Sequence, residues 1–159
     1  VVSAWISLRS LDEKNTRTYF ILLISIGVPG MVLLGLVTQF VLQMQKWFEP
    51  SLVLPIAGMI FANSMNTVSL AGERFESELK RDGDYISARR IAWEASLIPQ
   101  INSLFAVGLV ALPGMMTGQI LSGVDPIIAV RYQIMVMWMT FGSGGLAAAF
   151  YLVLRKRCM

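Results

Sequence analysis

Two asparagines three residues apart, Asn63 and Asn66, stand inside a long apolar part of this 159-residue chain. That spacing puts both side chains on one face of a helix. An amide that lies in lipid is costly, so such side chains are expected to face other helices or a cavity. The pair therefore indicates either hydrogen bonds between helices or a polar transport pathway. Asn102, in a later apolar run, allows the same two interpretations.

Met115 and Met116 stand next to each other and belong to a set of ten methionines. Thioethers are soft ligands that suit Cu(I), but methionine also fills irregular space in helical cores. The second interpretation is favoured, and we predict no metal site in this chain. We nevertheless include the two methionines, with Asn63, Asn66 and Asn102, in the candidate transport pathway.

Groups that could catalyse a reaction are sparse. The chain has no histidine and a single cysteine, Cys158, so it offers neither a Cys/His metal site nor a histidine-activated nucleophile. It contains no GxxxxGK[ST] loop to cradle the phosphates of ATP. The sequence therefore predicts neither an enzyme nor a bound cofactor. The net charge of +3 comes from basic residues that flank apolar runs, which is typical of a membrane protein and does not indicate nucleic-acid binding.

Four uncharged runs are long enough to cross about 30 Å of hydrocarbon as helices. They are Thr18–Gln45, Pro50–Gly72, Ala95–Val124 and Tyr132–Leu154. The chain is 55% hydrophobic and only 14% charged, whereas a soluble domain is about 25% charged. We expect an all-α polytopic membrane helix bundle that forms a single domain over residues 1–159. It would hold four full transmembrane helices plus the end of an earlier one, because Val1–Leu8 is typical of the last turns of a membrane helix.

The basic residues predict the orientation of the bundle. Nearly all of the 13 Lys and Arg residues lie before the first run, in residues 73–94 or after the fourth run, and the exceptions are Lys46 and Arg131. Cytoplasmic segments of membrane proteins carry the excess of Lys and Arg. We therefore expect the N-terminal segment, residues 73–94 and the C-terminus to be cytoplasmic.

Residues 73–94 hold nearly half of the charged residues of the chain. Asp82-Gly83-Asp84 predicts a turn, and Asp84 suits the N-cap of a helix that begins at Tyr85. We expect two short helices around this turn, projecting into the cytoplasm. They are either a solvated connector or a docking surface for a cytoplasmic partner. The residues leave this open, although Tyr85 and Trp93 provide more apolar surface than a connector needs.

Proline interrupts the apolar runs at Pro55, Pro99 and Pro113-Gly114. Each proline removes a helical hydrogen bond and crowds the preceding turn. Such breaks are tolerated where neighbouring helices or water satisfy the freed carbonyl. These positions are either ordinary kinks or hinges. Gly114 and Gly118 form a GxxxG pattern, which favours close helix packing within the chain or between chains.

Two segments carry a resemblance to a known family. They are Pro55–Ile60 (PIAGMI), followed by Asn63, and Val107–Gly118 (VGLVALPGMMTG). The chain resembles the FetB-type iron-export permeases of ATP-binding-cassette transporters, which are related to plant aluminium-sensitivity membrane proteins. The resemblance covers most of residues 50–140. Family members are longer at the N-terminus, which implies that this chain is N-terminally truncated.

The resemblance implies a permease subunit for metal export, with iron as the expected metal, powered by a separate cytoplasmic ATPase subunit. It implies a multi-pass protein of the inner (plasma) membrane, and we expect a homodimer. The alternative is a non-transporting structural or assembly membrane protein derived from a permease fragment. The residues expected to couple to the ATPase surround the turn in residues 73–94 and are Gly83, Tyr85, Arg89 and Arg90.

Overall fold

The computed structural model describes residues 2–9, 16–41, 50–107 and 113–156. Helices make up nearly all of this part of the chain. They are α1 (Val2–Arg9), α2 (Thr16–Leu36) with its π-helical continuation η1 (Val37–Val41), α3 (Pro50–Asp82), α4 (Tyr85–Ala106), α5 (Gly114–Leu121) and α6 (Pro126–Lys156). The predicted helical membrane class is confirmed.

Three helical stretches are long and apolar enough to cross a membrane within the described residues. They are Thr16–Phe40, Val53–Arg81 and Pro126–Arg155. The third predicted span differs from the expectation of one continuous helix. Its residues are divided between α4, which ends at Ala106 with an extended Val107 (φ −69°, ψ 122°), and α5, for which Pro113 is the extended N-cap (φ −61°, ψ 137°).

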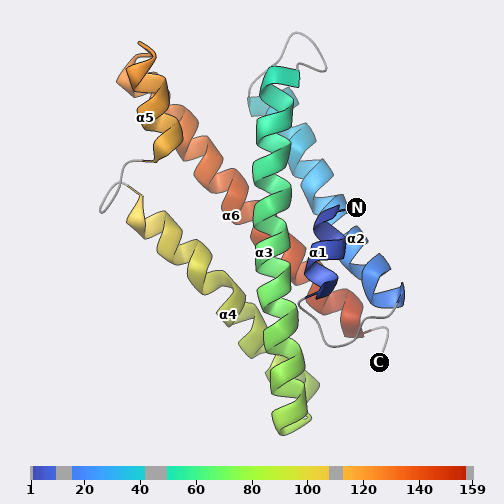
Figure 1. The fold of residues 1–159 in the computed structure, drawn as a ribbon. Coiled ribbons are helices and arrows are strands. Elements are labelled where there is room, and N and C mark those ends of the chain that lie inside the picture. The colour runs from blue at the N-terminus through green and yellow to red at the C-terminus, as the bar shows by residue number, and fades with distance from the viewer. Residues whose placement is uncertain (1, 10–15, 42–49, 108–112, 157–159) are drawn as a thin grey trace.

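Helix α3 is the centre of the bundle and packs against α1, α2, α4 and α6. Helices α3 and α6 run in the same direction along the molecule, while α2 and α4 run back (Figure 1). The α3–α4 turn lies at one end of the molecule, and α5 lies near the other end, against α6 (Figure 1). Long helices that follow one another in the sequence therefore alternate in direction, as the predicted spans require.

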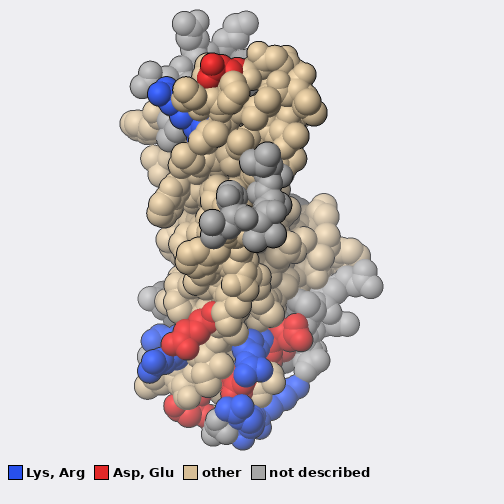
Figure 2. All heavy atoms as spheres, turned by 90° about the vertical axis from the view of Figure 1, so that its left-hand side faces the viewer, with Lys and Arg blue, Asp and Glu red and all other residues tan. Residues whose placement is uncertain are grey.

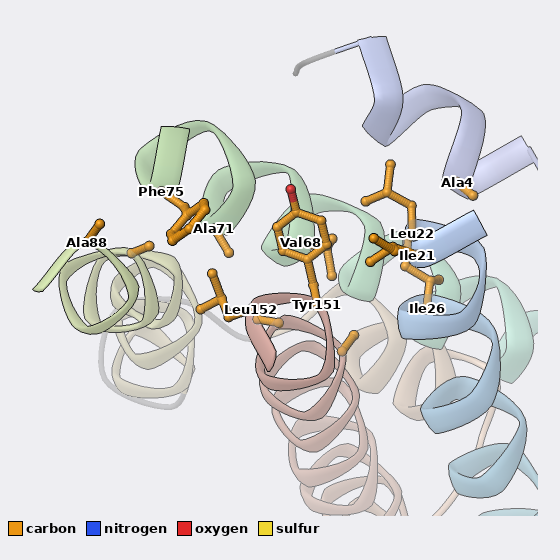
Figure 3. Close-up of a cluster of buried hydrophobic side chains, with 13 residues drawn as sticks. Ala4, Ile21, Leu22, Ile26, Val68, Ala71, Phe75, Ala88, Tyr151 and Leu152 are labelled. Carbon is orange, nitrogen blue, oxygen red and sulfur yellow. The ribbon is translucent and has the colours of Figure 1, made fainter. Parts of the chain in front are cut away.

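The main hydrophobic core joins side chains from five helices. Tyr151 projects from α6 among Val68 of α3 and Leu22 of α2 (Figure 3), and all three are fully buried. Phe75 extends the same core toward the α3–α4 turn, where its ring meets Tyr85 edge to face at a centroid distance of 5.5 Å. The charged end of the molecule is therefore packed into the bundle rather than detached from it.

The outward faces of the helices differ in chemistry. Helices α2 and α6 expose large apolar side chains such as Met31, Val32 and Trp138, as a face in contact with lipid would. Of the α3 side chains that the structure describes, Leu54 is the only large apolar one that is exposed. Between Leu54 and the α3–α4 turn, the outward face of α3 carries small and polar residues.

Candidate transport and coupling sites

A hydrogen-bonded polar cluster joins α3, α4 and α6 in the middle of the bundle. Asn63 donates from Nδ2 to the backbone oxygen of Thr140 at 2.6 Å. Gln100 donates from Nε2 to Oδ1 of Asn63 at 2.8 Å and to Oγ1 of Thr67 at 3.0 Å. Thr67 is buried, and Asn63 and Gln100 are half-buried. Asn63 thus makes hydrogen bonds to two neighbouring helices, and its predicted place in a transport pathway stays a prediction.

Close approach of α6 to α3 depends on a glycine beside this cluster. A Cβ at Gly144 would lie 2.7 Å from Oγ1 of Thr67 and 2.8 Å from Nδ2 of Asn63. The neighbouring Gly145 has room, since a Cβ there would meet only Leu97 at 3.8 Å. The small residue is therefore needed at position 144 for the two helices to bring the cluster together.

The other predicted pathway residues do not join Asn63. Asn66 is exposed on the outward face of α3, in line with Gly58 and Ala62, and Asn102 is exposed on α4. Asn63 and Asn66 thus face different surroundings although they are only three residues apart. A rotation of about 60° separates them around the helix axis, since each residue advances by about 100°, and the edge of the buried face falls between them.

Met115 and Met116 lie on α5, which packs against α6 at the end of the molecule away from the α3–α4 turn. Met115 is exposed and Met116 is half-buried. In the part of the chain that the structure describes, no group of three or more His, Cys, Asp or Glu side chains could hold a metal ion. A Cβ at Gly114 or Gly118 would meet nothing within 4 Å, so the GxxxG pattern faces open space on the described surface.

The turn between α3 and α4 has the predicted local geometry. Gly83 has a φ of +69°, which favours glycine, and its N–H donates to the oxygen of Leu79 at 3.0 Å. Asp84 accepts from the N–H groups of Ile86 and Ser87 at 3.3 and 2.9 Å. The predicted N-cap at Asp84 is confirmed. The two helices expected on either side of the turn are present, as the end of α3 and the start of α4.

Tyr85 connects this turn to the end of α6. Its hydroxyl donates to the backbone oxygen of Leu152 at 2.7 Å. The guanidinium carbon of Arg89 lies 5.9 Å from the centroid of the same ring, within the range of a cation–π contact. Arg90 points to solvent and pairs with Glu94 at 3.0 Å. The four predicted coupling residues therefore lie at one end of the molecule, and Tyr85 is the one that reaches α6.

A buried ion pair lies close to this turn and was missed by the sequence prediction. Nη2 of Arg155 donates to Oε1 of Glu76 at 3.1 Å, and Nη1 donates to Oγ1 of Thr18 at 2.9 Å. Arg155 had been counted with the basic residues that follow the fourth span, yet only 6% of it is exposed. The sequence does show a carboxylate, Glu76, just after an apolar run. It does not show that Glu76 pairs with Arg155, which lies 79 positions further along the chain.

Charged side chains gather at the end of the molecule that holds the α3–α4 turn, and a second small group lies at the opposite end (Figure 2). A wide uncharged band separates the two on the face shown. Asp125 stands just before α6 and Arg131 near its start, at the end of that helix away from Arg155. This distribution fits a molecule whose middle lies in a membrane.

The predicted hinge residues fall into two kinds. Pro55 and Pro99 are exposed and lie within the unbroken helices α3 and α4. Pro113 and Gly114 stand instead at the start of α5, after the stretch 108–112, which lies outside the described residues. The helices therefore continue through Pro55 and Pro99, whereas Pro113-Gly114 begins a separate helix.

Comparisons with known proteins add an independent finding. A sequence model described as the uncharacterised protein family UPF0014 matches residues 1–91 and 86–159. A UPF0014 membrane protein of Synechocystis is 35% identical over 153 residues, which cover 87% of this chain and 59% of that relative. The probable iron export permease protein FetB of Escherichia coli is 40% identical over 126 residues, which cover 69% of this chain and 49% of that protein.

A plant relative is also similar. The protein ALUMINUM SENSITIVE 3 of Arabidopsis thaliana is 31% identical over 111 residues, which cover 60% of this chain and 41% of that protein. The chain thus spans about half the length of the curated relatives it matches. No solved structure matches it.

Proposed function

Because this chain belongs to the UPF0014 family of membrane proteins, we propose that it is part of a permease subunit of an ATP-binding-cassette transporter. The permease exports a metal ion, with iron as the expected substrate, and a separate cytoplasmic ATPase subunit supplies the energy. The similarity to a probable iron export permease over 69% of the chain carries this proposal. The spanning helices and the absence of a P-loop in the sequence agree with a subunit that moves solute and leaves hydrolysis to a partner.

The α3–α4 turn is the proposed contact with the ATPase. Gly83, Tyr85, Arg89 and Arg90 lie at or beside the turn, at the end of the molecule where charged residues gather. A push on the turn reaches α6 through the hydrogen bond from Tyr85 to Leu152, and it reaches α3 through the contact between Tyr85 and Phe75. Tyr85 is therefore the residue through which we expect movement of the partner to be transmitted.

The moving part of the permease is expected to lie away from this end. Near the turn, α2, α3 and α6 are tied together by Arg155, Glu76 and Thr18. Helix α5 has no fully buried residue and packs chiefly against α6. Elements with few buried contacts open at lower free energy than core helices. We therefore retain Pro113-Gly114 as the leading hinge, ahead of Pro55 and Pro99.

The outward face of α3 is the proposed wall of the transport pathway. It presents Gly58, Ala62 and Asn66 where other helices present large apolar side chains. Such a face suits either water in a pathway or another helix packed closely against it. A homodimer or further spans of a longer protein would enclose it. Asn102, Met115 and Met116 remain proposed pathway residues that this chain alone does not bring together.

The orientation follows from the charges. We propose that the end with the α3–α4 turn and the end of α6 are cytoplasmic, in an inner (plasma) membrane. Cytoplasmic segments carry the excess of Lys and Arg, and this end holds most of them.

The proposal is tested by copurifying the full-length protein with its cognate ATPase. The double substitution Tyr85→Ala with Arg89→Gln is expected to reduce the ATPase recovered, whereas Arg131→Gln at the opposite end of α6 is expected to leave it unchanged. Undiminished recovery of the ATPase with the double variant would show that the turn is not its contact site. Cellular iron with and without the permease and ATPase then tests transport. Equal contents of iron and of other metals would favour a structural or assembly protein instead.

A further inference from the structure

A groove with a cavity volume of about 390 Å³ runs between α4 and α6 beside the charged end. Its lining includes Arg89, Arg90 and Trp93 from α4, and Ala149, Leu152 and Val153 from α6. The α6 wall is apolar throughout, while the α4 wall combines an indole ring with two guanidinium groups. The groove thus offers an apolar floor and a cationic rim.

The two arginines are available to an anionic group. The side chain of Arg90 is 80% exposed, and its pair with Glu94 is exposed too. Exposed pairs of this kind contribute little and exchange readily. Arg89 is half-buried, lines the groove and has its guanidinium carbon 5.9 Å from the centroid of the Tyr85 ring. A guanidinium presents N–H groups in a planar fork that matches a phosphate.

The groove lies where a membrane-spanning helix meets the headgroup region. The apolar stretch of α6 that could cross a membrane ends at Arg155, two residues beyond Val153. Trp93 faces the groove at this level, and indole rings are favoured at the membrane–water interface. Ile86 and Val153 are 69% and 54% exposed at the end of the groove nearer the α3–α4 turn.

We propose that this groove binds one anionic phospholipid. The phosphate lies between Arg89 and Arg90, and an acyl chain follows the apolar part of the groove along Trp93 and Ala149, away from the α3–α4 turn. Charge complementarity selects this occupant, because basic pockets between spanning helices on the cytoplasmic side suit anionic headgroups. The bound lipid would lie beside the hydrogen bond from Tyr85 to Leu152. This site goes beyond the proposed docking of the ATPase, although the two share Arg89 and Arg90.

The test is native mass spectrometry of the full-length protein, without the ATPase, during titration with phosphatidylglycerol or phosphatidylcholine in mild detergent. We expect phosphatidylglycerol to bind about 25-fold more tightly, since each of the two basic residues near an anionic lipid contributes a factor of about five. Arg89→Gln with Arg90→Gln should remove that preference, and the matched control Arg131→Gln should keep it. Ala149→Phe should fill the groove and weaken binding of both lipids.

Equal binding of the two lipids by the unchanged protein would overturn the proposal. An unchanged preference in the double variant would overturn it as well. A third contrary result is that neither lipid is retained while the ATPase still binds in a manner that requires Arg89, because the groove would then be a protein dock. Undiminished ATPase recovery with the Tyr85→Ala and Arg89→Gln double variant, together with intact lipid selectivity of the unchanged protein, would count against the docking proposal alone.

Discussion

Arg155 of α6 donates from Nη2 to Oε1 of Glu76 of α3 across 3.1 Å, and the two side chains are only 7% and 10% exposed. The same guanidinium donates to Thr18 of α2 at 2.9 Å. One arginine thus ties three helices together beside the α3–α4 turn. Its partners come from residues 18 and 76, so the contact exists only when the bundle is assembled.

Removing the arginine is therefore expected to destabilise the bundle strongly. Arg155→Gln takes the guanidinium away from the buried Glu76 carboxylate, and breaking a buried pair in this way costs about 3–5 kcal/mol. Thermal unfolding in lipid nanodiscs measures the loss. The matched control is Arg90→Gln, which breaks the exposed pair with Glu94 and should cost about 0.5 kcal/mol or less. Equal losses of stability in the two variants would show that the buried pair contributes no more than the exposed one.

The contact between α3 and α6 predicts that alanine affects stability differently at two adjacent glycines. Gly144→Ala places a methyl group 2.7 Å from Thr67 and 2.8 Å from Asn63, and such overpacking costs about 1–3 kcal/mol. Gly145→Ala meets only Leu97 at 3.8 Å and should be neutral or slightly stabilising. Unfolding of the two variants under the same conditions checks this. A greater loss for Gly145→Ala would contradict the helix packing described.

Replacement by leucine is expected to affect stability at Asn63 and metal export at Asn66. Asn63→Leu removes the hydrogen bonds to Thr140 and from Gln100 and should cost about 1–2 kcal/mol of stability. Asn66→Leu changes an exposed side chain, so stability should change little while metal export falls. Unfolding and transport assays on both variants separate the two roles. Full export by a stable Asn66→Leu protein would remove Asn66 from the pathway.

The start of α4 should depend on its cap. Asp84→Ala removes the acceptor for the N–H groups of Ile86 and Ser87, a loss of about 0.5–2 kcal/mol. Asp84→Asn keeps an oxygen in the same position and should retain most of the stability. Hydrogen exchange at the amides of residues 86–88 reports the effect directly. Faster exchange in the asparagine variant than in the alanine variant would argue against the cap.

The proposed orientation can be checked with two single-cysteine proteins in a background that carries Cys158→Ser. Ser77→Cys lies near the end of α3 and Ser122→Cys lies in the turn before α6, and both positions are exposed. A membrane-impermeant maleimide should label residue 122 in intact cells and residue 77 only after permeabilisation. The reverse pattern would invert the orientation inferred from the basic residues.

Local features of this protein were accessible from its sequence. The apolar runs predicted spanning helices, and Asp82-Gly83-Asp84 predicted the turn and its cap, because hydropathy and backbone preference depend on residues that are neighbours in the chain. The third run shows the limit. Its hydropathy is continuous, but Pro113 starts a new helix, and hydropathy does not register a change of backbone path.

Contacts between distant residues were decided only by the tertiary structure. The sequence could not tell that Asn63 faces the bundle while Asn66 faces outward, or that Gln100 completes the cluster. Nor could it tell that Arg155, one of the basic residues after the fourth apolar run, forms a buried pair with Glu76. Each of these depends on how whole helices rotate and cross. That arrangement is set by the summed packing of many side chains, and so no local pattern carries it.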